Sequence, residues 1–282
     1  MSPYSFLNDF KFAVQIIEVM GYVAALFVGI SLGLIGGGGS ILTVPVLVYL
    51  FGVSPLLATS YSLFVVGSTS LVGAFNNYRK GFVRIHTALL FGATSITTVF
   101  LTRKFLIPAI PKTFGYIGSF EITEAVVTMV LFAILMVTAA VAMIKSKTKT
   151  VTINGDEHKK VNVLKLSIYG IAIGLATGLL GAGGGFLLIP TLVLLVKLPM
   201  KEAVGTSLFI IALNSLIGFT GDLGHFTINW VFLMTITTIA VAGIFIGGVL
   251  NKKIPGDKLK KGFGWFVLSM GIYILTKELF LK

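Results

Sequence analysis

Long apolar runs separated by short polar segments follow one another from one end of the chain to the other. The longer runs hold about 20 residues, the length that an α-helix needs to cross the hydrocarbon core of a bilayer. By run length they predict about ten helical segments, five in each half of the chain. The segments lie at about 12–35, 40–51, 56–75, 85–102 and 121–144, and at about 162–180, 185–196, 201–220, 228–250 and 259–280.

The first apolar run, 12–35, is interpreted as a membrane span. It is too long for the apolar region of a cleavable signal peptide, and it leads into a Gly-rich segment without a small-residue cleavage site. The pattern as a whole therefore predicts an all-α polytopic membrane protein.

The two halves of the chain repeat each other. Segment 33–45 returns as segment 178–190, an offset of 145 (178 minus 33), and the same offset pairs Ala58 with Ala203 and Gly73 with Gly218 without a gap. Such self-similarity indicates two copies of one structural unit. We expect an N-terminal five-segment repeat at 1–145, a charged cytoplasmic linker at 146–160 and a C-terminal five-segment repeat at 161–282.

The second segment of each half, 40–51 and 185–196, is too short to cross the bilayer alone, so it either completes a broken crossing or re-enters on one side. Counting Lys and Arg favours crossing. If these segments cross, one face collects 16 basic residues and the other six, including Arg103 and Lys104, whereas re-entrant segments give 12 and 10. Five crossings are an odd number, which places the halves in inverted orientation with both termini outside, an arrangement typical of transporters.

Composition excludes most other classes of protein. Hydrophobic residues make up 56% of the chain and charged residues 11%, against about 25% charged residues in soluble domains. The net charge of +12 comes from Lys and Arg between apolar segments, where they set topology, so we expect no nucleic-acid partner. The chain has no cysteine, and its three histidines, His86, His158 and His225, are scattered along the sequence. The sequence therefore predicts no metal and no cofactor.

Two glycine clusters, at 36–39 and 181–185, stand at matching positions of the two halves. Neither is followed by the Gly-Lys-Ser/Thr of a phosphate loop. Runs of this length interrupt a helix, and the free N–H groups where the helix resumes attract anions. We therefore expect an anion to bind between the two breaks near the bilayer midplane, with its oxygens approaching the offset-paired Gly39 and Gly184; close packing of helices through small residues is the alternative.

Hydroxyl and amide groups on the third and eighth segments could complete the anion's shell. Each hydroxyl taken alone is more often bonded to its own helix, and the offset-paired Ser62 and Ser207 are the better candidates. The predicted substrate site consists of Gly36, Gly37, Gly38, Gly39, Ser40, Ser62, Gly181, Ala182, Gly183, Gly184, Gly185, Thr206, Ser207 and Asn214.

Two acidic residues, Glu18 and Asp222, are candidates for coupling transport to protons, because ionisable groups within membrane segments are rare and functional. Asp222 aligns with Asn77 at the offset of 145, so one half has a titratable group where the other is neutral. The alternatives are an interfacial helix cap for Asp222 and snorkelling to the membrane surface for Glu18.

The sequence Gly-Leu-Ile-Gly-Gly-Gly-Gly-Ser at 33–40 with Pro45, its second copy Gly-Leu-Leu-Gly-Ala-Gly-Gly-Gly at 178–185 with Pro190, and Ala-Val-Gly-Thr-Ser-Leu at 203–208 resemble the TauE/SafE family of sulfite and organosulfonate exporters. The resemblance covers nearly the whole chain. It implies a multi-pass plasma-membrane carrier for small sulfur-containing anions.

We therefore expect a secondary transporter of small sulfur-containing anions such as sulfite or organosulfonates that works by alternating access. The partners are a small anionic substrate, the bilayer and protons as a candidate coupling ion; the sequence gives no oligomeric state. The alternatives are an anion channel or a carrier of another small organic or inorganic anion. No Asp-Asp, Ser-His or His-Glu-x-x-His constellation lies within the segments, so an enzyme is not expected.

Overall fold

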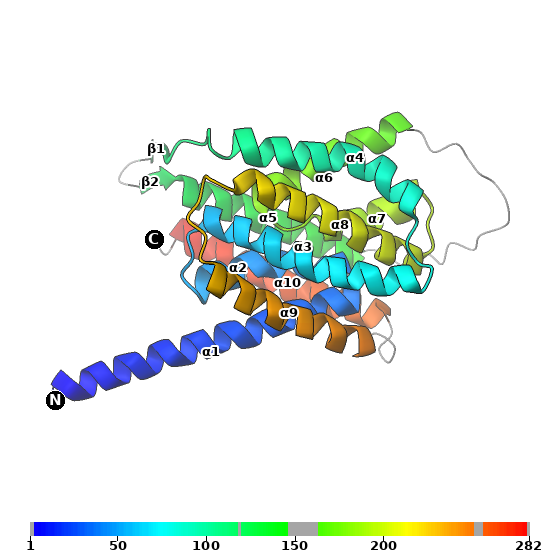
Figure 1. Cartoon of the computed structure of the whole chain (residues 1–282). Helices are drawn as coiled ribbons and strands as arrows, with labels where there is room; N and C mark the ends of the chain where they lie inside the picture. The colour runs from blue at the N-terminus through cyan, green and yellow to red at the C-terminus, as the bar shows by residue number, and fades with distance from the viewer. Residues whose placement is uncertain (1–2, 118–119, 146–162, 251–255, 281–282) are drawn as a thin grey trace.

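The computed structural model describes residues 3–117, 120–145, 163–250 and 256–280. The predicted linker, 146–160, lies outside the described residues. The first half contains α1 (Pro3–Ile35), η1 (Gly37–Leu42), α2 (Thr43–Tyr49), α3 (Pro55–Arg79), α4 (Ile85–Leu101), η2 (Thr102–Leu106) and α5 (Glu124–Lys145). The second half contains α6 (Val163–Leu180), α7 (Gly185–Leu195), α8 (Met200–Asp222), α9 (Trp230–Leu250) and α10 (Gly256–Phe280). The fold is a bundle of roughly parallel and antiparallel helices (Figure 1).

The described residues include seven helices that are long and apolar enough to cross a membrane by length and composition, whereas the apolar helices Gly37–Tyr49 and Leu164–Leu180 are shorter. The protein is therefore an all-α polytopic membrane protein, as predicted. Large apolar side chains such as Phe27 and Val231 lie on the outside of the bundle, where a bilayer replaces water as the solvent.

One element was not predicted. A two-stranded antiparallel hairpin, β1 (Thr113–Ile117) and β2 (Phe120–Thr123), stands at one end of the bundle between η2 and α5. β2 overlaps the first residues of the segment predicted at 121–144, so the helix there begins three residues later than predicted, at Glu124. Apolar run length does not reveal strands as short as these.

Helices α3 and α8 form the centre of the bundle. In each of them 67% of the span is buried, against 28–39% in the other five candidate spans. They run antiparallel, because Gly67 packs against Leu216 and Gly73 against Leu208. Glycine at these positions lets the two helices approach closely, as small residues do between membrane helices.

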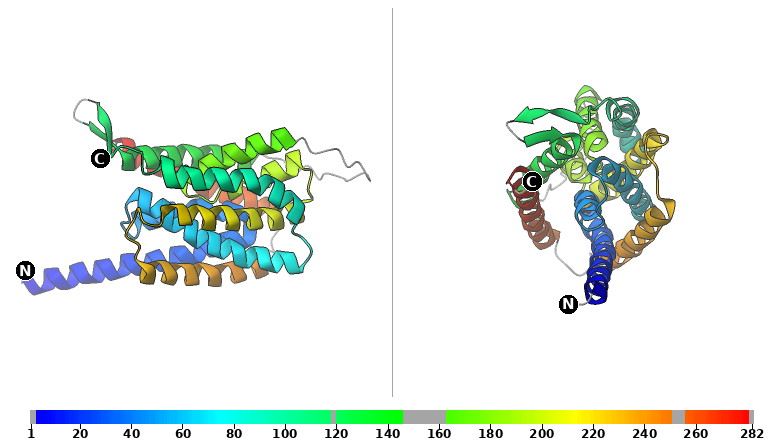
Figure 2. Two further views of the ribbon diagram at one scale, coloured as in Figure 1. Left: turned by 45° about the horizontal axis from the view of Figure 1, so that its top comes forward. Right: turned by 90° about the vertical axis from the view of Figure 1, so that its left-hand side faces the viewer.

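The remaining long helices pack in pairs around this centre: α1 with α9, α4 with α6, and α5 with α10 (Figure 2). A Cβ atom at Gly29 would lie 2.0 Å from the carbonyl oxygen of Ala240, and one at Gly174 would lie 2.6 Å from that of Ser95. Both residues of the second contact are related to those of the first by 145 positions (29 plus 145 is 174; 95 plus 145 is 240). The repeated sequence therefore makes repeated contacts.

The chain reverses direction at the first Gly-rich segment, since α2 runs back beside α1 (Figure 1). The rings of Tyr22 and Phe51 pack edge to face with centroids 5.4 Å apart, so the chain has returned to the level of Tyr22 before α3 begins. The short segment thus ends at the end of the bundle from which α1 entered. The loops after α2 and α8 and the β-hairpin share this end, whereas the loops after α3 and α7 lie at the opposite end.

Candidate functional site

The two Gly-rich breaks meet in the interior of the bundle. Gly36 has φ of 76° and Gly181 has φ of 66°, in the left-handed region that favours glycine. The backbone can therefore turn sharply at both positions, where α1 and α6 end. Beyond the turns, Gly37 touches Gly185: a Cβ atom on Gly37 would lie 2.3 Å from the Cα of Gly185. This contact leaves no room for a ligand between the two glycines.

Two serine hydroxyls join the breaks across the halves. Ser40 donates a hydrogen bond to the carbonyl of Ala182 and also contacts the Gly37 carbonyl at 2.8 Å, and Ser62 donates to the Gly181 carbonyl at 2.7 Å. All of these hydroxyls are buried. The structure therefore brings together the predicted cluster of Gly36, Gly37, Gly38, Gly39, Ser40, Ser62, Gly181, Ala182, Gly183, Gly184 and Gly185.

Gly39 and Gly184 belong to this cluster but do not face its centre. A Cβ atom at Gly39 would lie 2.1 Å from the Ser31 hydroxyl on α1, and one at Gly184 would lie 2.3 Å from the Thr177 hydroxyl on α6. Each glycine packs against the helix that precedes it. A side chain added at either glycine would therefore first meet the preceding helix, and the expectation that a ligand's oxygens approach these two glycines stays a prediction.

Two other predicted residues, Ser207 and Thr206, lie elsewhere. Ser207 donates to the Val204 carbonyl of its own helix at 2.9 Å, which is the ordinary role of a helix hydroxyl. Thr206 accepts a hydrogen bond from the backbone N–H of Arg84 at 3.0 Å, at the N-terminal end of α8.

Glu18 does not join the cluster either. It is exposed on α1, and its carboxylate accepts a hydrogen bond from the Tyr22 hydroxyl at 3.1 Å.

Asn214, the remaining residue of the predicted site, is buried on α8 and donates a hydrogen bond to the Ser95 hydroxyl at 2.6 Å.

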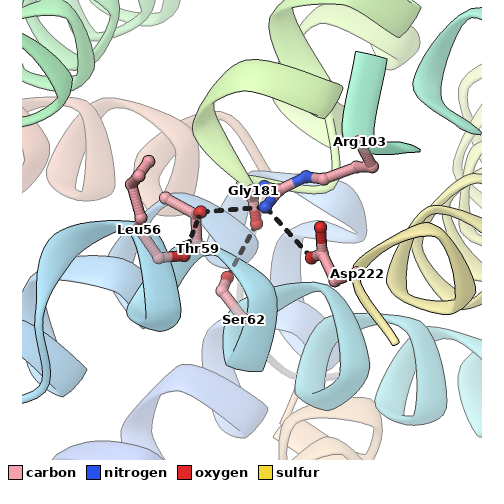
Figure 3. A network of polar contacts seen from close by, with 6 residues as sticks. All are labelled: Leu56, Thr59, Ser62, Arg103, Gly181 and Asp222. Atoms are coloured by element: carbon pink, nitrogen blue, oxygen red, sulfur yellow. Dashed lines mark hydrogen bonds and ion pairs between the residues drawn. The ribbon is translucent and has the colours of Figure 1, made fainter. Parts of the chain in front are cut away.

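A buried ion pair adjoins the second break. Nη1 of Arg103 lies 3.1 Å from Oδ2 of Asp222 and 3.0 Å from Oγ1 of Thr59, and the Arg103 and Asp222 side chains are 0% exposed (Figure 3). Asp222 is thus a buried counter-ion and not an interfacial cap. The Ser60 hydroxyl lies close to the carboxylate without meeting the geometry of a hydrogen bond.

The sequence predicts Arg103, together with Lys104, in a loop outside the membrane, whereas the structure buries the Arg103 side chain completely. The helix continues past Leu101 into the π-helical turn η2, which carries Arg103 inward, whereas Lys104 stays exposed beside the Phe100 and Phe105 rings. π-Helical turns of this kind recur at functional sites. A signal was present in the sequence: Arg103 and Asp222 both end apolar segments that the topology places at one face of the membrane.

Several buried polar atoms have no hydrogen-bond partner among the described residues. Such atoms are rare because an unpaired buried polar group costs free energy, and they are functional candidates at membrane depth. They are the hydroxyls of Thr43, Ser60, Ser70, Thr177 and Ser215, Oδ1 of Asn214 and of Asp222, and Nε and Nη2 of Arg103.

The ion pair breaks the correspondence between the halves. At the offset of 145, Arg103 corresponds to Gly248 (103 plus 145), Asp222 to Asn77 (77 plus 145) and Thr59 to Val204 (59 plus 145). Gly248 and Asn77 line a small cavity of about 40 Å³ instead. The second half thus leaves space at the position where the first half places its arginine.

Among the described residues, no group of three or more acidic, His or Cys side chains could hold a metal ion.

Residues 22–274 match the family model described as sulfite exporter TauE/SafE. A probable membrane transporter protein of Xylella fastidiosa (strain 9a5c) is 28% identical over 256 residues, which cover 89% of this chain and 92% of that protein. The probable membrane transporter protein YunE of Bacillus subtilis (strain 168) is 28% identical over 282 residues, covering 93% of this chain and 100% of that protein. The probable membrane transporter protein MJ0441 of Methanocaldococcus jannaschii is 37% identical over 115 residues, covering 39% of this chain and 43% of that protein. No solved structure matches the chain significantly.

Proposed function

Because the chain belongs to the sulfite exporter TauE/SafE family and is a membrane transporter, we propose that it carries small sulfur-containing anions such as sulfite or organosulfonates as a secondary transporter. The observation that carries this proposal is the buried polar centre between α3 and α8, where two Gly-rich breaks and a charged pair meet in an otherwise apolar bundle. Polar centres at membrane depth, built from interrupted helices of two repeats, are where transporters bind their substrates.

The proposed substrate site is the meeting point of the two breaks. Gly185 begins α7, and the first N–H groups of a helix have no carbonyl partner within it, which favours an anion nearby. Since Gly37 and Gly185 are in contact, substrate entry requires the two breaks to separate. The described conformation corresponds to a state in which the site is closed.

The proposed mechanism is alternating access of two inverted halves. At one end of the bundle the backbone N–H of Arg84 donates to Oγ1 of Thr206 at 3.0 Å, and at the other the backbone N–H of Asn229 donates to the Tyr61 hydroxyl at 2.8 Å. These contacts are related by the offset (84 plus 145 is 229; 61 plus 145 is 206). Opening the site toward one side would break one of them and keep the other.

Protons are the proposed coupling ion, with Asp222 as the residue that carries the proton. It is fully buried, and the ionisable groups near its carboxylate are Arg103 and His225. Protonation would neutralise Asp222 and release Arg103 from its partner, which gives a proton a way to change the charge of the site.

Transport and binding test the proposed function together. Purified protein is mixed in separate samples with sulfite, thiosulfate, sulfoacetate, taurine or sulfate, and the melting temperature is measured. A ligand that binds only the folded state and is present at a concentration of 100 times its Kd stabilises that state by about 2.7 kcal/mol. Liposomes carrying the protein should take up the stabilising anion with saturation and counterflow. A macroscopic, non-saturating current would instead favour a channel, and the absence of both binding and uptake across the panel would overturn the proposed function.

The proposed orientation predicts that the linker faces the cytoplasm. The chain has no cysteine, so Asn154→Cys in the linker and Ser54→Cys before α3 each introduce a single thiol. In intact cells a membrane-impermeant maleimide should label Ser54→Cys and not Asn154→Cys, because the segments between them place these positions on opposite faces. The reverse labelling would contradict the orientation.

A further inference from the structure

We propose that Arg103 binds the transported oxyanion directly, through the Nε and Nη2 edge of its guanidinium, and that Asp222 on Nη1 is the internal counter-ion whose negative charge opposes the anion. This inference rests on the proposed function, and it names the side chain and the ligand chemistry of the site: an anion with two oxygen atoms on one centre, as in a sulfite, sulfonate or carboxylate.

Burial supports a functional role for this arginine. Both charged side chains are 0% exposed. The other buried carboxylate among the described residues, that of Glu278, lies near the C-terminal end of α10 and accepts a hydrogen bond from the Tyr49 hydroxyl at 3.0 Å. A buried ion pair gives little net stability over apolar side chains of the same shape, because desolvating two charges offsets their attraction. Charged groups kept at membrane depth usually serve a substrate or ion pathway.

The unused edge of the guanidinium specifies the ligand. Nη1 holds both contacts, to Thr59 and Asp222, whereas Nε and Nη2 have no partner among the described residues and are buried. These two N–H groups point in parallel and match two oxygens of one anion in a bidentate hydrogen-bonded pair. Chloride has no second atom to fill the fork, so it should bind more weakly than an oxyanion.

Thr59 fixes the arginine beside the second Gly-rich break. Its hydroxyl donates to the Leu56 carbonyl at 2.7 Å, which leaves its lone pairs to accept from Nη1 of Arg103 (Figure 3). The backbone of Thr59 packs against Gly181, where a Cβ atom would lie 2.3 Å from the Thr59 carbonyl oxygen. A movement at this break is therefore transmitted to Thr59 and to the arginine that it holds.

The asymmetry of the pair separates this role from packing. Helix packing is repeated in both halves, as the Gly29 and Gly174 contacts are, but Arg103 corresponds to Gly248 and Asp222 to Asn77, beside a small cavity. A purely structural pair would not explain why one half needs it and the other does not. We therefore assign one arginine-based oxyanion site to each chain.

The test compares variants that keep or remove the buried charge balance. Arg103→Gln with Asp222→Asn removes both charges together, so that no unpaired charge is left behind, and Arg103→Lys keeps the charge but loses the fork. Lys104→Gln, which removes the exposed neighbouring charge, is the matched control. Sulfite, sulfoacetate and chloride are titrated into each purified protein by calorimetry, and monodispersity in detergent checks the fold.

We expect the double variant to remain folded and to lose measurable oxyanion binding, and Arg103→Lys to raise the Kd for sulfoacetate at least about tenfold. Lys104→Gln should bind as the wild type does, and Asp222→Asn at least as tightly, since the negative charge that opposes the anion is gone. A folded double variant with an unchanged Kd overturns the inference. If the double variant does not fold, an unchanged Kd in Arg103→Lys overturns it equally.

The two proposals fail in different ways. If the wild type carries an oxyanion in liposomes and the arginine variants carry it equally well, the Arg103 site is wrong and the proposed function stands. If the wild type neither binds nor carries any oxyanion of the panel, the proposed function fails, and the Arg103 site fails with it because it has no ligand.

Discussion

Valine in place of Gly37 is expected to abolish transport and to lower the melting temperature sharply. A Cβ atom at Gly37 would lie 2.3 Å from the Gly185 Cα and 2.5 Å from Cδ1 of Ile211. The first of these atoms belongs to the backbone of the opposite break and cannot rotate away, so the two halves must move apart. Overpacking of this kind costs about 1–3 kcal/mol, and more where backbone must shift.

Gly262→Val provides the control for this variant. Gly262 lies on α10, and a Cβ atom there would meet nothing within 4 Å, so the added side chain has open space. Melting in detergent and uptake into liposomes are compared for both variants. A Gly37→Val protein that melts and transports like the wild type would show that the breaks can separate freely, contrary to the packing described above.

Substitutions at Gly39 and Gly184 answer a different question. Added bulk at either position would collide with Ser31 or Thr177 on the preceding helix, so a loss of activity would report on the packing of each break against its own helix. These substitutions therefore cannot distinguish a loss of ligand binding from a loss of packing within one half. A substitution at Gly37 instead tests the contact between the two halves.

Asp222→Asn is expected to make transport insensitive to a pH gradient while substrate binding is retained. Asparagine is nearly isosteric with aspartate but cannot exchange a proton, so the charge of the buried site no longer follows pH. The change leaves Arg103 without its counter-ion, which should favour an anion as the replacement partner. The measurement is initial uptake into liposomes at several imposed pH gradients.

Glu18→Gln removes the other acidic candidate and is the matched control. Because Glu18 is exposed on α1 and accepts a hydrogen bond from the Tyr22 hydroxyl, away from the buried ion pair, its loss should leave the pH dependence of uptake intact. An Asp222→Asn protein whose uptake follows the pH gradient as the wild type does would remove Asp222 from the coupling mechanism. Loss of pH dependence in Glu18→Gln instead would transfer the role to that residue.

The sequence alone was sufficient for the features that depend on local composition. Apolar run length located the helices, because a span must cover the hydrocarbon core wherever it packs. The end of α1 at Ile35 and of α6 at Leu180 followed from the glycine clusters, since several consecutive glycines favour leaving the helix in any context. The repeat at 145 positions likewise needed no coordinates.

Tertiary structure alone decided the partners of the polar side chains. Ser62 and Ser207 occupy matching positions in the repeat, yet Ser62 bonds the opposite half and Ser207 its own helix. The sequence predicted Arg103 to be a basic loop residue, because a charge can be buried only when a partner of opposite charge lies at the same depth. That partner, Asp222, is 119 residues away along the chain. Apolar patterning fixes which segments leave water, whereas pairing across the bundle fixes which charges can go with them.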